Sequence, residues 1–126
     1  MCLITVENRK KAAEDIICYK VLRPQNGGLV SPAQYRCGNV LYWTVGETKK
    51  DNAKGRKHDD IVEGGYFHSF KNIQDAMDYK EFCCPIYQIF KATIPKGTWY
   101  YEGNNSTFKR APGYASKSLR IDKYEP

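Results

Sequence analysis

Short stretches rich in β-branched and aromatic residues alternate along the chain with polar, glycine-containing segments. The clearest of these stretches are 16–22 (IICYKVL), 40–45 (VLYWTV), 66–70 (YFHSF) and 86–94 (IYQIFKATI). Runs of this length and composition, bounded by turn residues, predict β-strands. Both faces of 86–94 carry apolar residues at their start, which predicts that this strand lies in the middle of a sheet.

Weaker apolar runs predict three further strands, at 3–6, 99–101 and 118–121. The first is expected at a sheet edge, followed by a charged segment that extends to residue 14 as a helical turn or a loop. The letters PQNGG after 16–22 predict a loop that ends this strand at Pro24. Turns are also predicted at 95–97 and at 103–106. In the former, Pro95 would occupy position i+1, Lys96 position i+2 and Gly97 position i+3.

One helix is predicted directly after the strand at 66–70. Asn72 is a favourable N-cap, and Asp75 in the first turn complements the helix dipole. Ile73, Ala76 and Met77 have the i, i+3, i+4 spacing of an apolar helical face. The helix is expected to end before Pro85. About six or seven strands with one or two short helices make an α+β domain with a mostly antiparallel sheet.

The segment 46–60 is polar and has no apolar periodicity, so we predict an exposed loop or hairpin. It carries the basic residues Lys49, Lys50, Lys54, Arg56 and Lys57. Loops of this length in small domains are uncommon and are often functional, although a merely flexible loop is the plainer interpretation. These five side chains are therefore candidates for a basic interaction surface.

The bulk composition is that of one soluble globular domain over residues 1–126, because 41% of the residues are hydrophobic and 27% are charged. No apolar run is long enough to span a bilayer, and the start MCLITVENRKK does not have the pattern of a signal peptide. We therefore expect a cytoplasmic protein without membrane contact. The oligomeric state stays open.

The five cysteines match no zinc spacing and include no Cys-x-x-Cys, so we predict reduced thiols and no metal site. The state of the neighbouring Cys83 and Cys84 stays open.

The net charge of +6 favours an anionic partner such as a nucleotide, a nucleic acid or an acidic protein surface. Ten tyrosines, by contrast, suit a site that is partly apolar and partly wet. Alternation places Tyr66, His68 and Phe70 on one strand face, where His68 could act as a base or bind a ligand. A structural histidine is the competing interpretation.

The order of several motifs resembles that of ADP-ribosyltransferase domains of the arginine–serine–glutamate type, over roughly residues 15–121. The motifs are Tyr19-x-x-x-Arg23, an aromatic strand with Ser69 before a helix, a strand ending in Ile-Pro-Lys-Gly-Thr, a strand bearing Tyr101 and a short final strand. The resemblance implies a split, mostly antiparallel sheet. Tyr-Phe-His-Ser-Phe, Tyr-Tyr-Glu-Gly and Tyr-Ala-Ser are also similar to segments of small phage and gut-bacterial proteins, which implies no activity.

Carried over by position, the resemblance implies that Arg23 holds NAD phosphates and that Ser69 supports the nicotinamide site. The family's Glu-x-Glu should precede the last strand, where this chain has Ser116-Lys117-Ser118. Serine cannot supply the negative charge that stabilises the developing oxocarbenium. We therefore expect no transferase activity, and Glu102 is the one nearby replacement.

The expected function is that of a non-catalytic binding protein, of a phage type, that holds a nucleotide, a nucleotide-derived signal or RNA and thereby inhibits a host defence system. Its location would then be the host cytoplasm. The candidate ligand-binding residues are Tyr19, Arg23, Tyr66, His68, Ser69 and Tyr101. No cofactor is expected. Two alternatives stay open: an active ADP-ribosyltransferase with a rewired site, which would use NAD, and a module that binds and inhibits a host protein.

Overall fold

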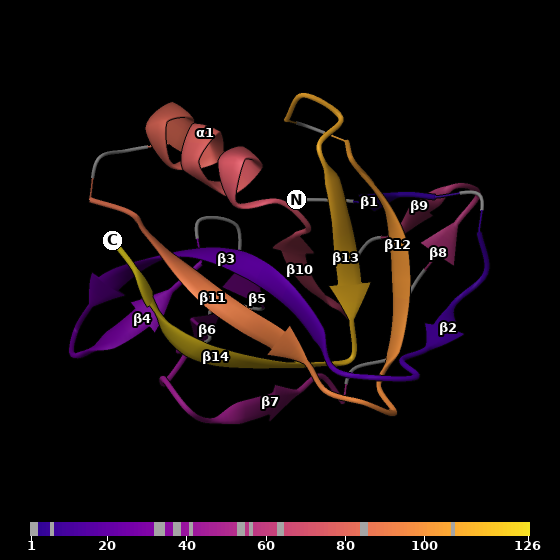
Figure 1. The fold of residues 1–126 in the computed structure, drawn as a ribbon, viewed down its shortest axis with the longest axis horizontal. Helices are drawn as coiled ribbons and strands as arrows, with labels where there is room; N and C mark the ends of the chain where they lie inside the picture. Colours follow the sequence, from indigo (N-terminus) through magenta and orange to yellow (C-terminus); the bar gives the residue numbers. More distant parts are fainter. Residues whose placement is uncertain are drawn as a thin grey trace.

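A computed structural model describes residues 3–126, apart from 6, 32–34, 37–38, 41, 53–54, 56, 63–64, 84–85 and 107. Its main feature is one 12-stranded sheet, and the pairings between its described strands are antiparallel. Among the described residues one α-helix, α1 (Ile73–Cys83), packs against it (Figure 1). The predicted α+β class with a mostly antiparallel sheet is thereby confirmed.

The strands of the sheet are β1 (Leu3–Ile4), β2 (Lys10–Lys11), β3 (Ile16–Gln25), β4 (Gly28–Val30), β7 (Thr48–Lys50), β8 (Lys57–His58), β9 (Ile61–Val62), β10 (Phe67–Phe70), β11 (Gln88–Ile94), β12 (Trp99–Asn105), β13 (Pro112–Ser116) and β14 (Ser118–Glu125). A separate pair is formed by β5 (Tyr35–Arg36) and β6 (Asn39–Val40).

The sheet consists of two halves that meet between β3 and β10. Its strand order is β7-β14-β11-β3-β10-β13-β12-β1-β9-β8, and β2 and β4 are attached beside β12 and β3. In Figure 1 the long antiparallel strands β3, β11 and β14 lie along one diagonal, and β12 and β13 run steeply across it. The sheet therefore changes direction where β3 meets β10.

In the part of the chain that the structure describes, three clusters of buried side chains stabilise the sheet and its contact with α1. The first is centred on Trp43 and Phe67, whose ring centroids lie 4.9 Å apart. The second joins α1 to β3, β10 and β11 through aromatic contacts that include Phe70 with Tyr79. The third lies under β1, β12 and β13 and contains a pair of tyrosines, Tyr66 and Tyr101. Burial of these aromatic rings supplies much of the apolar area that stabilises the fold.

Two predictions about the N-terminal part are wrong. β1 pairs with β12 on one side and β9 on the other, so it is not an edge strand. The charged segment contains β2, which pairs with Trp99 and Tyr100 of β12 and is not helical. The two lysines of β2 have no apolar pattern that could predict a strand or its distant partner β12.

Two strands continue past their predicted ends. β3 runs through Pro24 because Asn26 and Gly27, both with positive φ, form a tight hairpin that pairs Pro24 with Leu29. β12 continues through the predicted turn at 103–106, and the chain reverses only near Lys109 and Arg110. Pairing with β13 keeps Gly103 and Asn104 extended.

The turn after β11 is present but shifted by one residue. Thr98 N donates to Pro95 O at 3.1 Å, which places Lys96 at i+1 and Gly97 at i+2. Gly97 has a φ of 88°, the conformation that position i+2 of a type II turn requires. Glycine's freedom at positive φ therefore decided the register of the turn.

The helix lies where it was predicted, but its buried face differs. Ala76 and Tyr79 are buried against the sheet, whereas Ile73 and Met77 are 38% and 42% exposed. The predicted apolar face is therefore wrong except for Ala76. The i, i+3 pair of Ala76 and Tyr79 is the face that fits the aromatic cluster with Phe70.

The predicted strand at 40–45 has less regular structure than expected, and the predicted loop at 46–60 has more. Within 40–45, Trp43 forms only an isolated bridge to Leu29, and residue 41 lies outside the described part. The basic segment contributes β7, paired with β14, and β8, paired with β9. It is therefore not one exposed loop, because both ends are drawn into the sheet.

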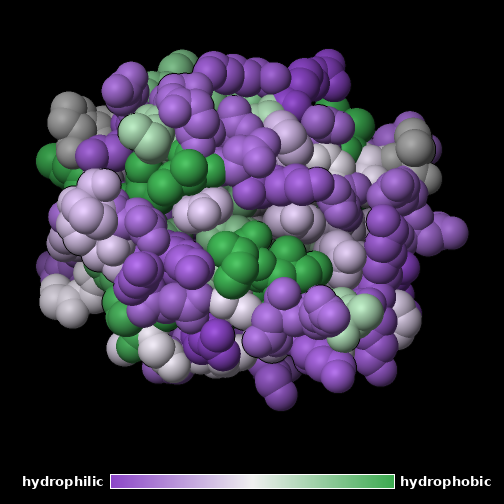
Figure 2. Space-filling view, viewed as in Figure 1, coloured by the Kyte–Doolittle hydropathy of each residue, from purple (hydrophilic) through white to green (hydrophobic). Residues whose placement is uncertain are grey.

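The surface in the orientation of Figure 1 is largely hydrophilic and is interrupted by separate hydrophobic patches (Figure 2). Within the described residues, no helix is long and apolar enough to cross a membrane.

Candidate functional site

Two of the candidate side chains, Tyr19 and His68, lie at the junction of the two half-sheets. β3 and β10 pair only through Tyr19 and Phe70, whereas β3 pairs along most of its length with β11. Past that single pair the two strands separate, and side chains from both of them face the space between. We call this place the β3–β10 junction.

Lys20 is the most unusual residue there. Alternation along β3 places it with Cys18 and Leu22, both in the Trp43 cluster, and its side chain is only 4% exposed. Lys20 Nζ donates to the carbonyl oxygen of His68 at 2.5 Å and lies 5.8 Å from the centroid of the Trp43 ring. Burial lowers the pKa of Lys20 to about 8 because the charged form loses its hydration.

Among the described residues, the contacts recorded for the Lys20 ammonium are the bond to His68 O and the approach to the Trp43 ring. Among the described residues no carboxylate forms an ion pair with it. A buried lysine without an acid is costly to the fold. An anionic partner from outside the chain would relieve that cost.

His68 lies on the neighbouring strand. Its Nε2 atom is buried and has no hydrogen-bond partner. Burial, and secondarily the charge of Lys20, lower the pKa of His68 to about 3. The imidazole is therefore neutral at physiological pH, and its Nε2 is available for one hydrogen bond to a ligand or a water.

A small cavity of about 10 Å³ lies between these groups, lined by Tyr19, Lys20, Val21, Ser31, His68, Phe70 and Tyr79. Such a volume holds roughly one water-sized group. Only one oxygen-sized part of a larger ligand could occupy it, and the remainder would have to lie outside.

Arg23 and Ser69, which were also predicted at this site, lie on β3 and β10 but do not line the cavity. Arg23 donates from Nη2 to Gln25 Oε1 at 2.7 Å, and its guanidinium lies 5.8 Å from the Tyr87 ring. Its Nε is buried without a partner. Arg23 does not line the cavity. The structure therefore brings Tyr19 and His68 to the cavity and leaves Arg23 further along β3.

Ser69 points to the opposite side of β10 from His68. Its hydroxyl is buried without a close hydrogen-bond partner. It lies beside the Cys18 thiol, whose pKa is raised by burial to about 12. That thiol stays protonated at neutral pH and is a poor nucleophile.

Tyr66 and Tyr101 lie together in a different cluster, with ring centroids 5.4 Å apart. Lys117 Nζ is 4.5 Å from the centroid of the Tyr66 ring and donates to Gly65 O at 2.6 Å. The six candidate residues therefore fall into two groups, and these two tyrosines do not contribute to the cavity at the junction.

The described basic candidates lie on two different strands. Lys49 and Lys50 belong to β7 and Lys57 to β8, which are the first and last strands of the order. Lys49 also pairs with Glu47 at 3.2 Å. Lys54 and Arg56 lie outside the described residues.

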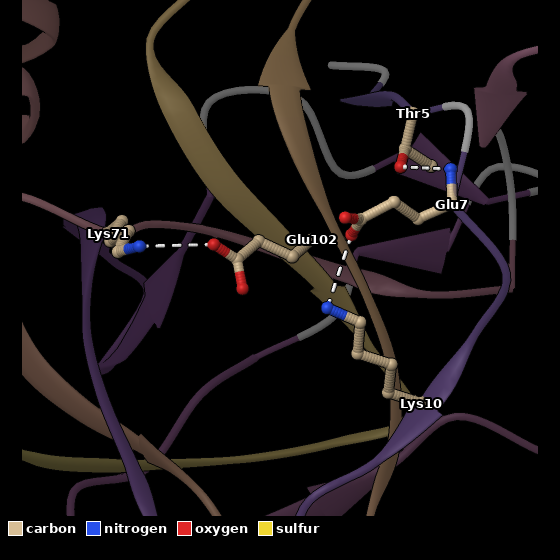
Figure 3. A network of polar contacts seen from close by, with 5 residues as sticks. All are labelled: Thr5, Glu7, Lys10, Lys71 and Glu102. Atoms are coloured by element: carbon tan, nitrogen blue, oxygen red, sulfur yellow. Dashed lines mark hydrogen bonds and ion pairs between the residues drawn. The ribbon is translucent and has the colours of Figure 1, made fainter.

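The positions at which the transferase resemblance expects acids hold no carboxylate. Ser116 ends β13 with a buried hydroxyl that has no partner, and Lys117 forms the turn to β14. Glu102, the one replacement considered, points toward Lys71 and pairs with it at 3.0 Å (Figure 3). Beside it, Glu7 pairs with Lys10 at 3.2 Å in an open groove.

Lys20 was not predicted as a site residue. The available signal was its position: a lysine between Cys18 and Leu22 falls on the apolar face of a strand. An ionisable residue on such a face is either paired or functional.

Comparison with models of known protein families, with curated proteins and with solved structures found no match to the chain. The resemblance to ADP-ribosyltransferases stays a prediction.

Proposed function

We propose that this chain is a non-catalytic binding protein that holds an anionic group of a nucleotide or a nucleotide-derived signal at the β3–β10 junction. The observation that carries the proposal is the Lys20 ammonium, buried beside a small cavity and paired with no carboxylate among the described residues. One phosphate oxygen in the cavity would lie beside Lys20 and His68, both of which line it.

The buried ammonium of Lys20 favours an anion over a neutral group. An anionic oxygen about 4 Å from the ammonium would gain roughly 4 kcal/mol of Coulombic attraction at an effective dielectric constant near 20. The cavity admits only a small part of the ligand. Rings around the junction, including Tyr19, supply apolar and hydrogen-bonding surface for the part that remains outside.

Binding without catalysis is favoured by the protonation states of the junction residues. His68 has its pKa lowered to about 3, so it is a weak base, and Cys18 has its pKa raised to about 12. An ADP-ribosyltransferase with a rewired site is the alternative. It predicts NAD consumption that disappears in Arg23→Ala, and no label transfer from labelled NAD to a lysate would exclude it.

Thermal-shift and calorimetric titrations with NAD, ADP-ribose, mononucleotides and cyclic nucleotides test the proposal. A bound ligand raises the melting temperature with concentration. The matched variants are Lys20→Met, which removes the buried ammonium, and Lys123→Met, which removes an exposed one. Stabilisation of wild type and Lys123→Met, but not of Lys20→Met, is expected. No shift with any of these ligands, or an equal shift in Lys20→Met, contradicts the proposal.

We propose in addition that capture of a nucleotide signal would silence a host defence that depends on it. Expression of wild type, but not of Lys20→Met, should then restore phage growth in cells that carry such a defence. Equal restoration of phage growth by wild type and Lys20→Met would show that the effect does not depend on ligand binding at the junction.

A protein-binding module is the second candidate. It is favoured by the exposed apolar side chains at the end of α1 and the start of β11, where Phe82 is 72% and Ile86 is 54% exposed. Pull-down from host lysate that fails for Phe82→Ser but survives Lys20→Met would support it over nucleotide binding.

A further inference from the structure

A second surface, on the face of β12 away from Tyr100, combines cations with an exposed aromatic ring. Trp99, the first residue of β12, is 40% exposed. Arg9 lies over its ring with the guanidinium carbon 4.4 Å from the centroid, and Lys11 Nζ lies 5.8 Å from it. Arg9 and Lys11 are both exposed.

Strand register explains why these side chains share a face. Lys11 is the direct partner of Trp99 across the β2–β12 pair, and Arg9 lies two residues before Lys11. Lys10 pairs with Tyr100 and therefore faces the other side, where Glu7 neutralises it. The acid that pairs with this basic segment is thus turned away from Trp99.

The surface continues beyond Trp99. Lys117 N donates to Trp99 O at 3.0 Å, and its side chain covers the ring of Tyr66. Lys50, which is exposed, is the cross-strand partner of Ser118 in the β7–β14 pair. Asp51 lies near Tyr66 but is 8% exposed and presents little negative charge to solvent. We call Arg9, Lys11, Trp99 and Lys117 the Trp99 surface.

We propose that the Trp99 surface binds single-stranded nucleic acid, with a base stacked on the exposed part of Trp99 and the flanking phosphates held by Arg9 and Lys11. Stacking platforms bordered by cations are the means by which proteins bind single strands without reading sequence. A duplex keeps its bases stacked on one another, so it offers phosphates to this surface but no free base face.

A single strand fits this surface better than a membrane does. A membrane-binding face needs several apolar side chains that enter the bilayer together. Here one exposed aromatic ring is surrounded by cations. This surface is separate from the β3–β10 junction, and the proposal does not depend on nucleotide binding there.

Fluorescence anisotropy with labelled U12 and dT12 at low salt measures the binding directly. Tryptophan quenching supplies a second readout, because Trp43 is only 1% exposed and Trp99 is the ring that a base can reach. We expect Trp99→Ala to weaken binding roughly tenfold or more, and Trp99→Phe to retain most of it. Arg9→Gln with Lys11→Gln should weaken binding and reduce the salt dependence by about one phosphate contact per cation.

The control is Lys80→Gln with Lys123→Gln, which removes the same charge from α1 and the far end of β14. It should change affinity by less than about twofold if site-specific contacts dominate over net charge. Lys20→Met should leave oligonucleotide binding unchanged, which separates this surface from the junction. Circular dichroism and melting curves establish that each variant is folded.

Four results would overturn the proposal: no binding of either oligonucleotide at low salt, equal binding by Trp99→Ala and wild type, an equal loss in the charge-matched control, or a duplex bound as tightly as the single strand. Binding to phosphatidylserine vesicles that exceeds oligonucleotide binding would assign the surface to membranes instead.

Discussion

Lys20 on β3 donates to the backbone oxygen of His68 on β10, with 2.5 Å between Nζ and the carbonyl oxygen. This bond spans the place where the two half-sheets separate, and its two partners are 48 positions apart in the chain. It ties the halves together with a buried charge, where an apolar contact would be less costly. Because both residues are titratable and buried, we expect the stability of the fold to depend on pH.

The first prediction concerns stability at alkaline pH. The folded pKa of Lys20, about 8, lies below its ordinary value of 10.5, so the unfolded chain binds more protons between these two values. The unfolding free energy should therefore rise with pH across that window, by roughly 3 kcal/mol in total for this residue. Denaturant titrations of wild type and Lys20→Met at pH 7.5 and 10 measure the difference. An equal change in both proteins would contradict the assignment.

The second prediction concerns Lys20→Met at neutral pH. The variant keeps the apolar stem and removes a charge that is paired with no described acid, so its stability should equal or exceed that of wild type by up to about 4 kcal/mol. Lys20→Ala, which also leaves a void, should be less stable than Lys20→Met. A large loss in Lys20→Met would instead show that the bond to His68 O is a net stabilising contact.

The third prediction concerns the protonation of His68. Because burial lowers its pKa to about 3, the imidazole should stay neutral from pH 8 to pH 5. NMR shifts of the ring carbons in a His58→Asn background, which leaves one histidine, measure this directly. A titration midpoint near 6.5 would contradict the buried, uncharged ring. The sign for stability is the same as for Lys20: between about pH 3 and 6.5 the unfolded imidazole binds a proton that the folded imidazole does not, so stability falls as the pH is lowered through this window.

The fourth prediction concerns the close approach of β10 and β13. A Cβ added to Gly113 would lie 2.6 Å from the backbone oxygen of Ser69, whereas no atom lies within 4 Å of one added to Gly97. Gly113→Ala must move the two strands apart and should cost several kcal/mol, roughly the upper end for overpacking. Gly97→Ala should cost about 1 kcal/mol from its positive φ alone. Melting temperatures of the two variants compare these costs, and equal losses would argue against the close strand contact.

The fifth prediction concerns a β-bulge in β14. Lys123 and Ile121 pair with adjacent residues of β11, so Asp122 is the extra residue between them. Its carboxylate accepts from Thr93 Oγ1 at 2.5 Å and from Arg120 Nε at 2.7 Å. Asp122→Ala should destabilise the protein by about 1–3 kcal/mol, because it leaves the hydroxyl without its acceptor. Thr93→Val in the same background should then have little additional effect, and additive losses would contradict the coupling.

Local chemistry predicted the elements whose signals lie within a few residues. The helix after Asn72, the strand at Phe67–Phe70, the central position of β11 and the reversal at Gly97 all follow from caps, β-branched runs and turn residues. The turn at Gly97 and the exposed side chain of Ile73 differ from the prediction. A turn or a helical face that shifts by one residue has almost the same local composition, so the sequence does not distinguish the two positions.

Long-range pairing decided the rest. β2 consists of two lysines and is a strand only because β12 lies beside it, and β12 passes through Gly103-Asn104 because β13 holds it extended. Such partners lie up to about a hundred residues away, and no local pattern encodes them.

The amino-acid sequence by itself determined the α+β class, the helix, the strongest strands and the cationic, tyrosine-rich character of the chain. Tertiary structure alone decided that Lys20 and His68 face one cavity, that Tyr66 and Tyr101 lie elsewhere, and that Arg9 and Lys11 flank Trp99. The physical reason is that propensities act within a few residues, whereas a site is assembled by strand register and by the point at which two half-sheets separate.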